Sequence, residues 1–172
     1  MHLAGAVYVQ EDAFDSWKRR STELDETDHS FDARFAKSVT KTHREWQLLN
    51  RERLMAQQKW ADFFREYDVL LCPAFRIAAF PHDHTITLGT AQSITTKFDE
   101  QVVSHADVIL PWALLASASY LPATVAPIGL TPNGLPVGVQ IIGPYFEDRT
   151  SIHFATLIEE NVVGFSPPPG FS

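Results

Sequence analysis

Apolar side chains recur at alternating steps of three and four along the first half of the chain. The stripe runs from Phe35 to Tyr67 and includes Trp46 and Trp60. This spacing matches one face of an α-helix. It therefore predicts one helix, or two consecutive helices, over residues 30–67.

One position, Arg53, breaks this stripe. We interpret Arg53 as standing at a junction between two helices, with its guanidinium in water and its stem along apolar surface. The alternative is a buried arginine that pairs with a carboxylate. Buried arginines are uncommon, which favours the junction.

Short apolar runs replace the helical stripe in the second half. Residues 67–73 (YDVLLCP) predict a buried strand that proline ends, and residues 123–126 (ATVA) predict a second strand. Residues 135–142 (LPVGVQII) predict a third. Residues 131–134 (TPNG) read as a turn with proline at its second position, so the last two strands can pair as a hairpin.

A final helix is predicted after the third strand. Asp148 stands where a helix N-cap is expected, and apolar residues follow it at helical spacing. Helices combined with apolar, non-alternating strands indicate an α/β layer fold. The expected organisation is one partial domain over 1–166, with helices at 30–67, strands and loops at 68–146 and a helix at 148–163, and then a tail at 167–172.

Composition supports this division and excludes several function classes. All 11 prolines and seven of the eight glycines follow Leu71, whereas 11 of the 14 basic residues precede Asp68. The net charge of −7 argues against nucleic-acid binding, which usually shows a basic face. Cys72 is the single cysteine, which excludes an intramolecular disulfide framework. Its apolar neighbours predict an inert core thiol.

Residues 108–146 contain no charged side chain, which raises the question of a membrane span. Six prolines and four glycines interrupt this stretch, so we predict buried strands and turns there and no membrane association. The beginning of the sequence lacks the basic region of a signal peptide. A cytoplasmic protein is expected.

Candidate chemistry gathers in the longest predicted loop, where His82, Asp83 and His84 are adjacent. Two histidines flanking an acid can bind a metal or move protons. A third metal ligand is not apparent, so a polar loop that lines a pocket is the preferred interpretation. The sequence has no Gly-x-Ser-x-Gly elbow, phosphate loop or dinucleotide fingerprint. Ser117 and Ser119 are expected to bond to the backbone, and no cofactor or metal is expected.

Three stretches, in their order and spacing, resemble the amidase-signature family. Residues 63–73 (FFREYDVLLCP) resemble the passage from helix to strand late in these enzymes. Residues 121–129 (LPATVAPIG) resemble their next core strand. Residues 134–144 (GLPVGVQIIGP) are similar to the most recognisable C-terminal motif of the family. The resemblance extends from about Phe31 to about Glu160.

The resemblance implies an α/β/α fold around a large mixed sheet. It also implies hydrolysis of amide C–N bonds, or transfer of the released ammonia in the A subunit of the tRNA-dependent amidotransferase. The family uses a nucleophilic serine, a second serine joined through a cis peptide, and a lysine, and none of the three has a match here. We therefore expect no catalytic residue in this chain and no amide hydrolysis by the chain alone.

The resemblance also implies substrate-pocket residues. His82, Asp83 and His84 lie in a loop similar to pocket-bordering segments of the family. Asp107 stands near an acid that contacts the amino group of the substrate in the amidotransferase branch. The alternative for Asp107 is an ordinary surface acid.

Several explanations remain for an amidase-like chain without the catalytic residues. It can be the C-terminal portion of a complete amidase, or it can pair with a separate amidase N-terminal half. It can also be a non-catalytic binding or scaffold protein that closes its surface by self-association. A small-molecule amide is the substrate expected of the complete enzyme. A metal enzyme that uses His82 and His84 is the least favoured hypothesis. In each case a sheet edge and apolar surface should be exposed in the isolated chain.

Overall fold

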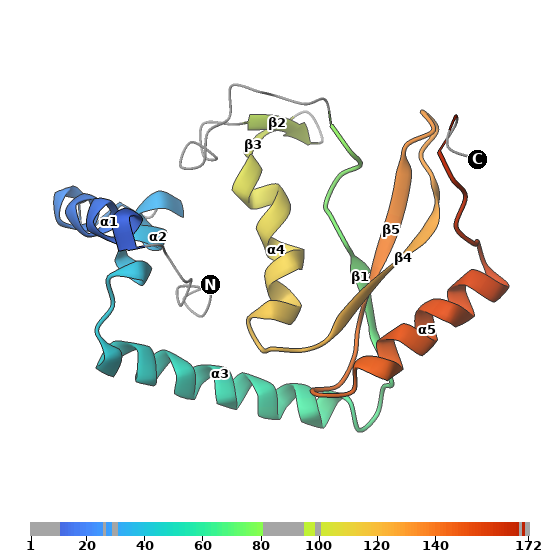
Figure 1. The fold of residues 1–172 in the computed structure, drawn as a ribbon, viewed down its shortest axis with the longest axis horizontal. Helices are drawn as coiled ribbons and strands as arrows, with labels where there is room; N and C mark the ends of the chain where they lie inside the picture. The colour runs from blue at the N-terminus through green and yellow to red at the C-terminus, as the bar shows by residue number, and fades with distance from the viewer. Residues whose placement is uncertain are drawn as a thin grey trace. The chain divides into compact units, whose positions relative to one another are not determined.

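The computed structural model describes residues 11–25, 27–28, 31–80, 95–98, 101–168 and 170, and Figure 1 shows its helices and strands. In chain order these are α1 (Glu11–Glu23), α2 (Phe31–Val39), α3 (His43–Phe63), β1 (Leu70–Pro73), β2 (Thr95–Phe98), β3 (Gln101–Ser104), α4 (His105–Ser117), β4 (Ala123–Leu130), β5 (Pro136–Ile142) and α5 (Asp148–Asn161). They form two compact units. The first contains the described residues up to Ala56 together with β2 and β3, and the second contains most of the rest of the chain from Gln57 onward.

In the first unit, α1 packs against α2. The rings of Trp17 and Phe35 meet edge to face, with their centroids 4.7 Å apart. The Lys37 ammonium donates a hydrogen bond of 3.1 Å to the carbonyl oxygen of Asp25 in the connecting turn. Ala33 and Ala36 are fully buried. Strands β2 and β3 form a separate antiparallel hairpin.

A capping box begins α3. The backbone N–H and the hydroxyl of Thr42 donate to Glu45 Oε2 at 2.8 and 2.7 Å, and the Glu45 N–H donates back to Thr42 Oγ1 at 3.3 Å. This reciprocal arrangement satisfies backbone donors that a helix N-terminus leaves open. The region thus contains two helices, and residues 40–42 separate them.

The interpretation of Arg53 as a helix junction is wrong. The helix α3 continues without interruption through this position, and Arg53 is only 8% exposed. Helix boundaries follow caps rather than interruptions in apolar periodicity, and the nearest cap is the Thr42–Glu45 box.

The capping box makes the start of α3 sensitive to pH. Hydrogen bonds from the side chain and backbone of Thr42 hold the pKa of Glu45 below its ordinary value. The carboxylate therefore stabilises the fold above the unfolded-state pKa, and this contribution is lost as the pH falls through the lower folded-state pKa. Replacing Thr42 by alanine should raise the pKa of Glu45 toward its ordinary value, which an NMR titration of the Glu45 carboxyl measures. An unchanged pKa would show that the hydroxyl contributes nothing in solution.

In the second unit, three antiparallel strands form a sheet in the order β1–β5–β4. The predicted strands and the predicted hairpin are confirmed. The Thr131 carbonyl oxygen accepts the N–H of Gly134 at 2.9 Å, which closes the predicted turn, and Gly134 has a φ of 78°. The resemblance implied a large mixed sheet. The described part of the chain supplies only an antiparallel portion of it.

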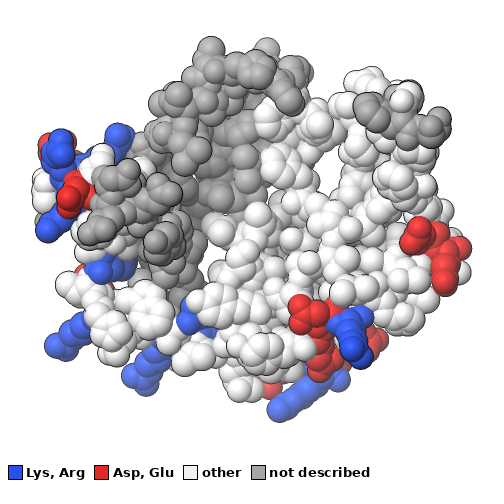
Figure 2. Space-filling model, viewed as in Figure 1, with Lys and Arg blue, Asp and Glu red and all other residues white. Residues whose placement is uncertain are grey.

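Helices cover both faces of this sheet (Figure 1). On one face, Cys72 and Ile142 pack with Ala116 and Leu121, against side chains from the end of α3 and from α4. On the other face, apolar residues of the strands pack under α5. The predicted α/β layer fold is confirmed. In Figure 2, the face of the molecule over β4 and β5 is white, since residues 123–142 carry no charge.

The helix α4 corrects the prediction of strands and turns at the start of the uncharged stretch. Pro111 lies inside this helix. Its C-terminus is closed by hydrogen bonds from the N–H of Tyr120 to Ser117 O and from the N–H of Leu121 to Ala116 O, at 3.2 and 3.1 Å. Tyr120 has a φ of 56°. This is a Schellman motif, which usually carries glycine at the left-handed position. With tyrosine there, no residue pattern indicated that a helix ends at this point.

The predicted N-cap of the last helix is shifted by one residue. Glu147 precedes the helix, and Asp148 is its first residue. The N–H of Glu147 donates to Pro144 O at 3.0 Å, and Phe146 adopts a φ of 64°. This turn determines where α5 begins. Among the described residues, no helix combines the length and hydropathy needed to cross a bilayer.

Candidate functional site

Four polar site residues were expected from the sequence, and one of them, Asp107, lies in a described element. His82, Asp83 and His84 lie outside the described residues. Asp107 is the third residue of α4, and its side chain is not described. Within the described part of the chain, no group of three or more His, Cys, Asp or Glu side chains could hold a metal ion.

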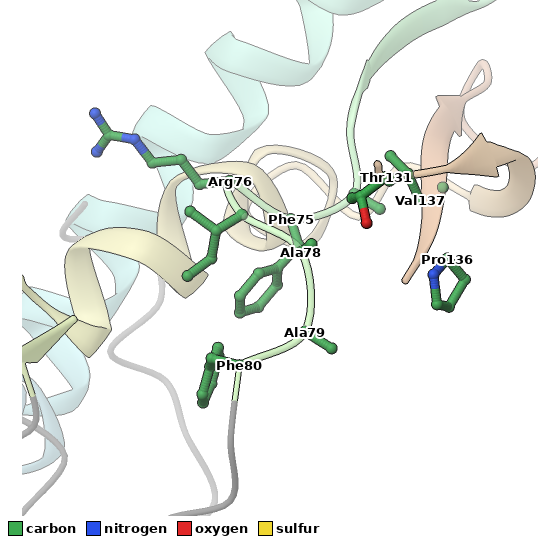
Figure 3. A pocket seen from close by; sticks show the side chains of 11 residues that line it. Phe75, Arg76, Ala78, Ala79, Phe80, Thr131, Pro136 and Val137 are labelled. Carbon is green, nitrogen blue, oxygen red and sulfur yellow. The ribbon is translucent and has the colours of Figure 1, made fainter. Parts of the chain in front are cut away.

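The structure instead shows a cavity of about 580 Å³ at one end of the sheet (Figure 3). Its walls are the segment that leaves β1 and the turn end of the β4–β5 hairpin. The lining residues are Ala74, Phe75, Arg76, Ile77, Ala78, Ala79, Phe80, Thr131, Pro136, Val137 and Gly138. No pattern in the sequence indicates this site, because its two walls are more than 50 residues apart in the chain.

The cavity wall is largely apolar. The rings of Phe75 and Phe80 have centroids 6.5 Å apart. The hydroxyl oxygen of Thr131 accepts the N–H of Leu135 at 3.0 Å, so it is used within the turn. In Figure 3, the Arg76 side chain extends away from Thr131 and Val137. This surface can hold an apolar group by excluding water, but its side chains include no serine, cysteine, lysine or histidine.

A close approach of β4 and β5 shapes the hairpin wall. A Cβ at Gly138 would lie 3.0 Å from Val125 Cγ1 and 3.3 Å from the carbonyl oxygen of Ala126. Real Cβ atoms rarely approach other atoms so closely, so glycine keeps the two strands together here. Gly138 therefore lines the cavity and also packs closely against β4.

A buried polar cluster lies two residues further along β5. The Gln140 amide donates to Cys72 Sγ and to the carbonyl oxygen of Trp112, both at 3.2 Å. Both Gln140 and Cys72 are buried. The predicted core position of Cys72 is confirmed, whereas nothing in the sequence pattern distinguished Gln140 as the group that joins β1, β5 and α4.

The two serines near the end of α4 contribute to the backbone hydrogen bonding of the fold. The Ser117 hydroxyl donates to Ala113 O at 3.0 Å, as predicted. Ser119 is buried, and its carbonyl oxygen accepts a hydrogen bond of 2.8 Å from the Gln57 amide. These contacts stabilise the turn between α4 and β4.

Comparison with known proteins gives one consistent result. A family model described as Amidase matches residues 7–152. The A subunit of glutamyl-tRNA(Gln) amidotransferase from Rhodospirillum rubrum is 29% identical over 119 residues, which are 69% of this chain and 21% of that protein. The subunit from an Exiguobacterium species is 30% identical over 116 residues, which are 67% and 21%.

Solved structures agree at the level of the fold. A crystal structure of an amidase aligns with a TM-score of 0.60 at 22% identity, covering 87% of this chain and 32% of that one. The A subunit of glutamyl-tRNA(Gln) amidotransferase from Thermotoga maritima aligns with a TM-score of 0.55 at 21% identity, covering 97% and 31%. The chain thus spans about a fifth of the curated relatives and about a third of the solved structures.

Proposed function

The chain belongs to the amidase family, and from this premise we propose that it is the C-terminal portion of an amidase-type hydrolase that acts on amide C–N bonds. In this proposal the chain supplies one wall of the substrate pocket. The serines and the lysine of the family come from the part of the fold that this chain does not match. The chain alone is then inactive.

The cavity at the end of the β4–β5 hairpin carries this proposal. One wall directly follows the first family-like stretch, residues 63–73, and the other belongs to the stretch at residues 134–144. The cavity offers a largely apolar surface, and the hydroxyl oxygen of Thr131 on its wall accepts a hydrogen bond within the turn. This is the composition expected of a wall that positions a substrate while another part of the protein supplies the reacting groups.

The described side chains have a limited role in the proposed reaction. Phe75, Phe80 and Val137 would hold the part of the amide that does not react and exclude water from it. Exclusion of water strengthens the electrostatic interactions that stabilise charge at the reacting carbonyl. His82, Asp83, His84 and Asp107 remain our candidates for polar contacts with the substrate.

Activity measurements on the purified 172-residue chain test this proposal. We expect no release of ammonia from glutamine or benzamide, and no labelling by a fluorophosphonate that reacts with activated serines. The chain should acquire neither property unless a portion of an amidase carrying the serines and the lysine is added. Serine-dependent hydrolysis by the chain alone would overturn the proposal.

A non-catalytic binding or scaffold protein is the second candidate. The two apolar clusters on either side of the sheet favour it, because they give the second unit a core of its own. A sharp, cooperative thermal transition together with no activity in the presence of an amidase catalytic portion would support this alternative. Extensive binding of a hydrophobic dye by the isolated chain would count against it.

A further inference from the structure

The strand β4 lies at an edge of the sheet and is incompletely covered. It pairs with β5 on one side only among the described residues. Its exposed apolar side chains are Val125, Ile128 and Leu130, which are 59%, 44% and 70% exposed. An exposed apolar edge strand readily accepts another strand.

The two faces of β4 differ. The register pairs Val125 with Gln140, and Gln140 with Cys72, so these three residues share one face. Gln140 and Cys72 are buried on that face, whereas Val125 is exposed. The helical cover therefore ends before it reaches β4. On the opposite face, Ala126 is buried in the cluster that includes residues of α5.

The other edge of the sheet is a weaker candidate for strand addition. The strand β1 has four residues and ends at Pro73, whereas β4 has eight. A bulge between Pro127 and Gly129 limits the regular part of β4 to its first five residues. Edge strands are commonly protected by charged side chains. The strand β4 carries none.

We propose that the edge of β4 and its uncovered face dock the catalytic portion of an amidase chain, which adds a strand beside Ala123–Ala126 and covers Val125. This inference rests on the proposed function. The length of the solved relatives supports it, since this chain covers only 32% of the amidase that it matches. A second copy of the chain is the less suitable occupant, because two chains of net charge −7 repel each other.

The cavity and this edge belong to the same sheet. Neighbouring strands lie about 4.8 Å apart, so a strand added to β4 would lie two strand spacings from β5, which contributes Pro136, Val137 and Gly138 to the cavity wall. These three residues pair with the part of β4 that follows Ala126. A portion docked beside Ala123–Ala126 therefore reaches the cavity by continuing along β4 toward the hairpin turn.

Binding of the chain to a catalytic portion tests the proposal directly. The probe is the portion of the Exiguobacterium A subunit that carries the serines and the lysine of the family, and its affinity is measured by biolayer interferometry. We expect a one-to-one complex that Val125→Lys weakens at least tenfold. Ile152→Lys is the matched control, because Ile152 is 55% exposed but lies on α5. It should change the affinity less than twofold.

Two further measurements, amide hydrogen exchange in β4 and the oligomeric state of the chain, distinguish the possible outcomes. In the complex, the amides of Ala123–Ala126 that point away from β5 should become protected from exchange. If Val125→Lys binds as tightly as the wild-type chain, or if exchange of these amides is unchanged in the complex, the docking surface is overturned. Release of ammonia by the complex tests the proposed function separately. A folded wild-type chain that does not bind would also overturn the docking surface. So would a homodimer that Val125→Lys dissociates, since the occupant would then be a second copy. If Val125→Lys fails to fold, Ala123→Lys replaces it, because Ala123 is exposed on the same face of β4.

Discussion

Replacing Ile142 by alanine should lower the free energy of unfolding by about 2–5 kcal/mol. Ile142 is 0% exposed and stands in the central strand, opposite Leu70 on one side and Ala123 on the other. Its side chain belongs to the cluster under α3 and α4. Truncation removes buried methyl and methylene groups and leaves a cavity that the two neighbouring strands cannot close without distorting the sheet.

Urea denaturation followed by circular dichroism measures this loss. A domain of this size is typically stable by only about 5–15 kcal/mol, so the midpoint should move clearly. The control is Ile128→Ala in the neighbouring strand, which removes the same atoms from a residue that is 44% exposed. Its loss should be much smaller. Equal losses at both positions would contradict the observed packing of the sheet.

Replacing Gln140 by glutamate should be destabilising at neutral pH, by about 3–5 kcal/mol. The change preserves the shape of the side chain but replaces the amide donor with a carboxylate. This carboxylate would face the carbonyl oxygen of Trp112 and the sulfur of Cys72, at the positions of the present hydrogen bonds. Burial without a donor raises the pKa of a carboxyl group. The loss should therefore shrink as the pH falls and the group becomes protonated.

Cys72 provides a second measurement of this effect. It is the single cysteine of the chain and is buried beside Gln140. Its reaction with Ellman's reagent at constant pH should accelerate in the glutamate variant, because the core opens more often. Gln47→Glu, at an exposed position on α3, is the control and should leave the rate unchanged. A variant as stable and unreactive as the wild type would show that the polar cluster does not form.

Much of the second unit could be predicted from the sequence, because its signals are local. The turn at Thr131–Gly134 has the proline and glycine that its geometry requires, and the apolar runs on either side form the paired strands. The motif at residues 134–144 then indicated the amidase family, which the family model matches.

The features that were missed depend on contacts between distant residues or on unusual residues at familiar positions. The helix α4 ends in a motif where tyrosine, rather than glycine, takes the left-handed conformation. The cap of α5 depends on the turn before it. The burial of Arg53 follows from tertiary structure that its polar character could not indicate.

The candidate site shows the same limit. The sequence directed attention to His82 and His84, whose chemistry is recognisable in isolation. The cavity is lined mainly by alanine, phenylalanine, isoleucine, proline and valine side chains, which are ordinary anywhere in a protein. Only the pairing of β1 with β5 brings the segment at residues 74–80 to the hairpin end.

The strand order also determines when this fold can form during synthesis. Leu70 pairs with Ile142, so the first strand of the sheet must wait for the last. The hairpin of β4 and β5 can form locally, but β1 pays the closure entropy of the long intervening loop. A ribosome that has not yet released residue 142 therefore carries β1 without its partner, and its apolar side chains remain available to chaperones until the central strand emerges.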